Sequence, residues 1–150
     1  MEETIPDSPR EALLRTLCGI APPAFEEFVN LAKDQRSDVR DAAVDGVIGL
    51  ARSSCDEKSR VVDSIVAKRF MPRQVKKLLD SGIPYRSEDL LTLCALCREE
   101  EVAYRLVAVR CVLTHPAMDA KRAFAVADSM RGDGAGNVRD AVHQFLDGLV

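Results

Sequence analysis

The sequence predicts an all-α protein made of stacked helical hairpins. Across its 150 residues the apolar patterns have a helical period, and no segment alternates polar and apolar residues over the length of a strand. One phrase also occurs twice, as DQRSDVRD from Asp34 to Asp41 and as DGAGNVRD from Asp133 to Asp140. The two copies lie 99 residues apart, which is three steps of 33. That step is about the length of one helical-hairpin repeat.

Composition and charge narrow the class of protein. Hydrophobic residues make up 47% of the chain and charged residues 30%, with no Trp, so a globular domain with aliphatic packing is expected over residues 1–150. No apolar run approaches the roughly 18 residues of a membrane span, and the acidic start MEETIPDSP is unlike a signal peptide. The five cysteines are an odd number without the spacing of a disulfide scaffold, which favours reduced thiols in the cytoplasm.

The helices are expected to pair over residues 22–52, 55–81, 87–114 and 117–150, after one helix that begins at Ser8. Residues suited to helix starts and stops set these bounds. The expected caps and starts are at Ser37, at Ser54 with Glu57, at Pro72, Ser87, Pro116 and Asn137, and Gly82 ends a helix. Gly46 keeps its helix thin, so a neighbouring helix can approach closely.

The repeated phrase resembles the inter-helix turn and second helix of a HEAT repeat, where an Asp and a short turn precede Val-Arg and apolar residues at helical spacing. This resemblance is clearest at residues 22–52 and 133–150, and the turn Asp and Val-Arg are missing from the middle two hairpins. It implies a short right-handed α-solenoid (superhelix) of about four HEAT-like hairpins plus an N-terminal helix; a less regular helical array is the alternative. In such repeats the Asp and Arg brace neighbouring repeats, a structural role that the resemblance carries to Asp34, Arg40, Asp133 and Arg139.

Two motifs could carry chemistry but have simpler interpretations. Cys94 and Cys97 have the spacing of half a zinc site or of a redox pair, yet both fall on an apolar helix stripe and no second pair of ligands completes the set. We therefore interpret them as core thiols. The loop from Gly132 to Asn137 is rich in glycine, but a nucleotide-binding loop would follow a strand and none is predicted. It is interpreted as a loop between helices, with Asn137 as the cap.

The two histidines, His115 and His143, have no Cys, Ser or carboxylate partner in fixed register, so surface or capping roles are expected. With no nucleophile and base in register, the sequence predicts no catalytic residue, no metal ligands and no cofactor. We therefore do not expect an enzyme.

Charge is segregated along the chain. The stretch KRFMPRQVKK contains five basic residues and no acid, namely Lys68, Arg69, Arg73, Lys76 and Lys77, while Glu99 to Glu101 are acidic. Either this stretch is a solvated helix face, or it docks an acidic protein surface. A phosphate backbone is less favoured because the net charge is −3.

The sequence therefore predicts a non-catalytic protein-binding module: an adaptor, regulator, chaperone-like factor or inhibitor whose partner is another protein with an acidic surface. The expected partner-binding residues are Arg69, Arg73, Lys76 and Lys77, with a ridge that bears Asp41, Asp45 and Arg105 as the second choice. The alternatives are a nucleic-acid-binding HEAT-like protein or a relative of the DNA glycosylases built on such repeats. Tetrapyrrole lyases built on related repeats form a further class.

Overall fold

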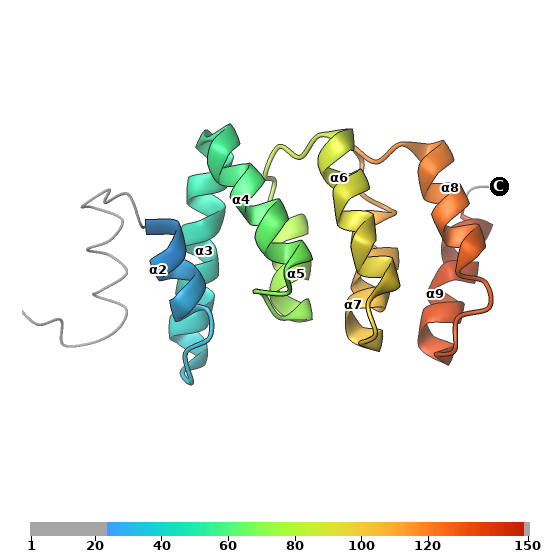
Figure 1. Cartoon of the computed structure of the whole chain (residues 1–150), viewed down its shortest axis with the longest axis horizontal. Coiled ribbons are helices and arrows are strands. Elements are labelled where there is room, and N and C mark those ends of the chain that lie inside the picture. The colour runs from blue at the N-terminus through green and yellow to red at the C-terminus, as the bar shows by residue number, and fades with distance from the viewer. Residues whose placement is uncertain (1–23, 149–150) are drawn as a thin grey trace, which may run out of the picture. The chain divides into compact units, whose positions relative to one another are not determined.

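The computed structural model describes residues 24–148, and all of the regular structure in that range is helical (Figure 1). The prediction of an all-α protein is confirmed, while the helix expected from Ser8 lies outside the described residues. The chain divides into two compact units, one ending at Val61 and the next beginning at Val62. The boundary falls inside helix α4 (Cys55–Val66), and the two units are taken in turn.

The first unit contains the hairpin of α2 (Ala24–Leu31) and α3 (Ser37–Ser53). The two helices pack against each other through an apolar face on each. Phe28 of α2 is fully buried, and its ring lies where a Cβ on Gly46 of α3 would be, 2.6 Å from the nearest ring carbons. The close approach expected at Gly46 is therefore present.

The second unit contains the remaining helices. They are α5 (Pro72–Leu79), α6 (Ser87–Leu93) with the 3₁₀ segment η1 (Cys94–Arg98), α7 (Val102–Val107) with the π-helical segment η2 (Ala108–Val112), α8 (Ala120–Ser129) and α9 (Gly136–Asp147). The helices fall within the pairs expected from the sequence. The 3₁₀ and π segments occur where the apolar pattern predicted uninterrupted α-helix.

The second helices of the hairpins lie next to one another in this unit. Both α7 and η2 contact α5 on one side and α9 on the other. Their buried side chains form the core between these helices: Val75, Leu78, Ala108, Val109, Val112, Val138 and Val142. The helix formed by α7 and η2 is therefore the central one, which is why its sequence is apolar on several sides.

Three of the expected helix starts differ in the structure. Helix α8 begins at Ala120 and not near Pro116, because the Asp119 carboxylate accepts the backbone N–H of Lys121 at 2.9 Å and caps the helix there. Asn137 is the second residue of α9, not its cap. Ser37 is the first residue of α3 and not its cap.

No side chain in the described range caps α3 or α9, and an acid in the preceding turn binds the backbone N–H of the residue just before each helix. The Asp34 carboxylate accepts the N–H of Arg36, and the Asp133 carboxylate accepts the N–H of Ala135, both at 2.9 Å. This is the Asx-turn geometry, in which an Asp side chain bonds the backbone two residues later. The predicted start at Pro72 is confirmed.

Candidate functional site

Three turns, those before α3, α7 and α9, share one hydrogen-bonding arrangement. Arg40 donates to the carbonyl oxygens six and five residues before it, at 2.8 and 2.9 Å. Arg105 donates in the same way at 2.8 and 2.7 Å, and Arg139 donates to the carbonyl six residues before it. Each arginine thus satisfies carbonyl groups that the turn leaves without a helical partner.

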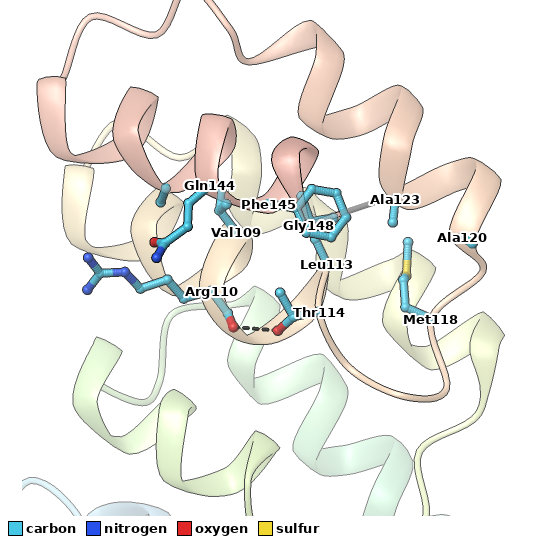
Figure 2. Close-up of a pocket in the computed structure, with 11 residues that line it drawn as sticks. Val109, Arg110, Leu113, Thr114, Met118, Ala120, Ala123, Gln144, Phe145 and Gly148 are labelled. Atoms are coloured by element: carbon cyan, nitrogen blue, oxygen red, sulfur yellow. Dashed lines mark hydrogen bonds between the residues drawn. The ribbon is translucent and has the colours of Figure 1, made fainter. Parts of the chain in front are cut away.

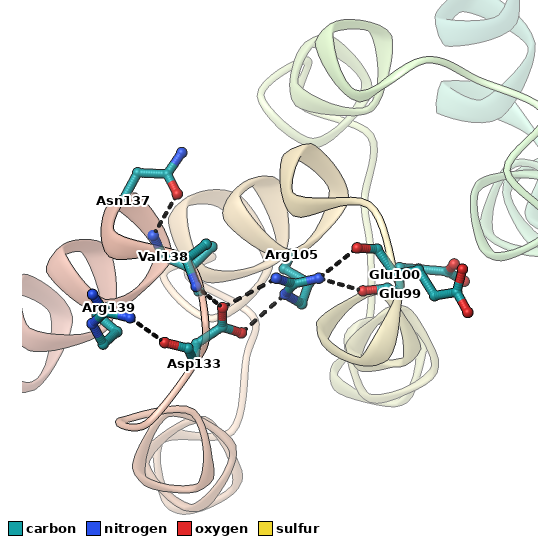
Figure 3. A network of polar contacts seen from close by, with 8 residues as sticks. Glu99, Glu100, Arg105, Asp133, Asn137, Val138 and Arg139 are labelled. Carbon is teal, nitrogen blue, oxygen red and sulfur yellow. Dashed lines mark hydrogen bonds and ion pairs between the residues drawn. The ribbon is translucent and has the colours of Figure 1, made fainter.

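In the second unit the acid of the last turn also binds the preceding hairpin (Figure 3). The Asp133 carboxylate accepts hydrogen bonds from Arg105 Nε at 2.9 Å and Nη2 at 3.1 Å. The two side chains are only 16% and 11% exposed. Burial opposes the ionisation of Asp133, but hydrogen bonds from Arg105 and the Ala135 amide outweigh it, so the pKa of Asp133 lies below its usual value.

Two more contacts join the hairpin of α5 to that of α7. Lys68, whose φ of 58° places it in the left-handed region, forms an ion pair with Glu99 at 3.2 Å. The hydrogen bond with Glu99 raises the pKa of Lys68. The Tyr104 hydroxyl donates to the buried carbonyl of Phe70 at 2.7 Å. The basic stretch is therefore connected to the acidic run through Lys68 itself.

These contacts refine the roles that the HEAT resemblance implied. Asp133 does connect two hairpins, but Arg40 and Arg139 donate within their own turns, and Asp34 pairs with Arg36 at 3.0 Å. The turn before α7 was not predicted, because its sequence EEEVAYR has Glu in place of Asp and Tyr in place of Val. Only the spacing of six residues from acid to arginine marks it.

The expected basic face lies on and before α5. Arg73, Lys76 and Lys77 are exposed, and Arg69 is half-buried. Lys76 pairs with Asp80 at 3.2 Å, but both side chains are more than half exposed. Such a pair contributes little to stability and leaves both charges accessible to a partner.

The second set of expected partner-binding residues is divided. Asp41 and Asp45 are exposed on α3 in the first unit. Arg105 belongs to the second unit, and its guanidinium is held on one side by its own turn and on the other by Asp133. Its place in the structure is therefore that of a brace between hairpins.

Cys94 and Cys97 lie on η1, half-buried, and line a cavity of about 600 Å³ that Asp133 and Met130 also line. Burial raises the pKa of Cys97 to about 12 and also raises the pKa of Cys94. At neutral pH both are thiols, which are poor nucleophiles and poor metal ligands. Within residues 24–148 no cluster of three or more His, Cys, Asp or Glu side chains could hold a metal ion.

The histidines lie in separate places. His115 Nδ1 accepts the N–H of Ala117 at 3.1 Å, and the His115 ring meets Tyr85 edge-on with 5.7 Å between centroids. Burial lowers the pKa of His115 against the opposing effect of Asp80. His143 is exposed on α9.

A cavity of about 570 Å³ lies between η2, α8 and α9 (Figure 2). Leu113, Met118 and Phe145 provide apolar lining, and Arg110 and Gln144 provide polar groups. Its volume is typical of ligand-binding pockets, about 300–1,000 Å³. No pattern in the sequence predicted this cavity.

No protein-family model, curated protein or solved structure matches the chain. Among the helices that the structure describes, none has the length and apolar character to cross a bilayer.

Proposed function

We propose that the chain is a non-catalytic, cytoplasmic protein-binding module, a short right-handed α-solenoid of HEAT-like hairpins that binds an acidic partner along its second helices. The observation that supports this most directly is the row of second helices in the second unit, α5, α7 with η2, and α9, each in contact with the next. A row of packed helices presents a rigid surface, so the module loses little conformational entropy when it binds a partner.

The charge of α5 supports an acidic partner. Arg73, Lys76 and Lys77 are exposed on one short helix whose apolar positions, including Val75 and Leu78, are buried. Complementary charge accelerates association and selects partners, and its effect falls as salt screens it.

The test begins with the tagged full chain, used to capture partners from a lysate of its source cells at about 50 and about 300 mM salt. The affinity of the purified partner is then measured for the wild type and for the double variant Lys76→Glu/Lys77→Glu. The matched control is Lys121→Glu/Arg122→Glu, which reverses two exposed charges on α8, a first helix.

The expected result is a loss of affinity of about tenfold or more in the α5 variant, whose circular dichroism spectrum stays that of the folded wild type, and little change in the α8 control. Equal affinities for all three proteins would show that the basic face is only solvated. Binding to duplex DNA or RNA with a steep salt dependence would favour the nucleic-acid alternative.

A further inference from the structure

The cavity between η2, α8 and α9 is apolar on one side and polar on the other. Leu113, Met118 and Phe145 line it, together with the small side chains Ala123 and Ala141. Figure 2 shows Phe145 and Met118 on one side of the pocket, and Arg110 and Gln144 on the opposite side. Such a cavity accommodates an apolar group that carries a polar group at one end.

The polar side of the cavity has unused hydrogen-bonding groups. Arg110 and Gln144 are exposed, and neither side chain forms a hydrogen bond or ion pair with a described residue. Among the residues that the structure describes, no Asp or Glu lines the cavity, and Arg110 is the charged residue that does. A guanidinium binds a carboxylate through two parallel hydrogen bonds, and an amide adds a further donor.

The positive charge of this cavity adjoins that of the basic face. Helix α5, which carries Lys76 and Lys77, contacts η2, which carries Arg110. Lys76 forms an ion pair with Asp80, whereas Arg110 forms none with any residue in the range 24–148. An acidic segment that lies along α5 would therefore reach an unpaired cation beside an apolar cavity.

Building on the proposed function, we infer that the cavity binds an apolar side chain of an acidic segment of the partner, and that Arg110 and Gln144 bind a carboxylate next to that side chain. The apolar anchor packs against Leu113, Met118 and Phe145. The acidic residues around it extend towards Lys76 and Lys77.

A defined peptide tests this directly. The probe is a fluorescent acidic peptide of about ten residues with blocked ends and one central Phe. Two matched peptides replace the Phe by Ser, or replace every acid by its amide. Binding is measured by anisotropy at low salt, and the methyl signal of Met118 is followed by NMR because this side chain lines the cavity.

Two variants and one control separate the cavity from the basic face. Arg110→Gln removes the cation. Ala120→Leu adds bulk from an exposed lining position, so that folding is preserved. Lys121→Gln is the control, because it removes an exposed cation next to Ala120 that does not line the cavity.

The expected result is that Arg110→Gln and Ala120→Leu each weaken peptide binding by about fivefold or more, that Lys121→Gln changes it by less than about twofold, and that Met118 shifts on binding. Both altered peptides should bind as weakly as the variants do. If the peptide or the intact partner depends on Lys76 and Lys77 but not on Arg110 or Ala120, the inference is wrong while the proposed function stands.

Two other occupants have distinct outcomes that would also overturn the inference. Phenylacetate binding as tightly as the peptide would assign the cavity to a small carboxylic acid. Concentration-dependent self-association that is lost in Ala120→Leu would assign it to a second copy of the chain.

Discussion

Replacement of Gly46 by Ala tests how closely α2 and α3 pack. A Cβ at this position would lie 2.6 Å from Cε1 and Cζ of Phe28 and 2.8 Å from Cδ1. Because Phe28 is 0% exposed, its ring has no solvent into which it could move. Overpacking of this kind costs about 1–3 kcal/mol.

The same substitution replaces a glycine inside a helix by alanine. Taken alone, this replacement stabilises a helix by about 0.5–1 kcal/mol. The net expectation for Gly46→Ala is a loss of about 1–2 kcal/mol in the free energy of unfolding. Gly49 offers a matched control on the same helix, because it is exposed and a Cβ there would meet nothing within 4 Å. Gly49→Ala should therefore stabilise the protein by up to about 1 kcal/mol.

Urea unfolding followed by circular dichroism measures both variants, and thermal unfolding should separate their midpoints by about 5 °C for a chain of this length. Adding Phe28→Leu to Gly46→Ala should cost less than the sum of the two single changes, because the smaller side chain relieves the clash. If Gly46→Ala is as stable as Gly49→Ala, the close approach of α2 and α3 is not as described.

Two further predictions concern the second unit. Asp133→Asn should cost about 1–3 kcal/mol at pH 7, because it leaves a largely buried arginine without its counter-charge. The folded-state pKa of Asp133 is lowered, so its stabilisation is present above the unfolded pKa of about 3.9 and is lost as the pH falls through the folded value. The free energy of unfolding, measured with urea at a series of pH values, should therefore fall less steeply towards acid pH in Asp133→Asn than in the wild type. If the two proteins lose stability in parallel, the pairing of Asp133 with Arg105 is contradicted. Cys97, with a pKa raised to about 12, should react with iodoacetamide far more slowly than exposed Cys55 at pH 8, as peptide mass spectrometry would show; equal rates would mean that η1 opens readily.

The helix periods could be predicted from the sequence because apolar spacing and strong local signals agree. Pro72 starts α5 because proline suits the first helical position. Gly82, with a φ of 80°, lies in the turn that follows the end of α5 at Leu79. Where two local signals compete, the sequence does not decide between them. Pro116 and Asp119 both suit a helix start, and the carboxylate cap of Asp119 prevails.

The turn before α7 and the cavity could not be read from the sequence for different physical reasons. The arginine contact of this turn depends on main-chain carbonyls, which any residue supplies, so it forms with Glu99 where the other turns have Asp. The cavity depends on three segments that are brought together only by packing. Arg105 was expected on an exposed ridge because sequence spacing does not show that Asp133 would cover it.

The cations of α5 have two physical explanations, and stability separates them. Lys76 and Lys77 occupy the last turn of α5, where a positive charge interacts favourably with the helix dipole by about 0.3–1 kcal/mol per residue. That explanation makes them part of the fold, so reversal of their charge would lower the free energy of unfolding. Arg73 near the helix start gains nothing from the dipole and is exposed as well. Its presence beside the two lysines therefore favours recognition over helix stabilisation, and an affinity loss on Arg73→Gln without a change in stability would be specific to recognition.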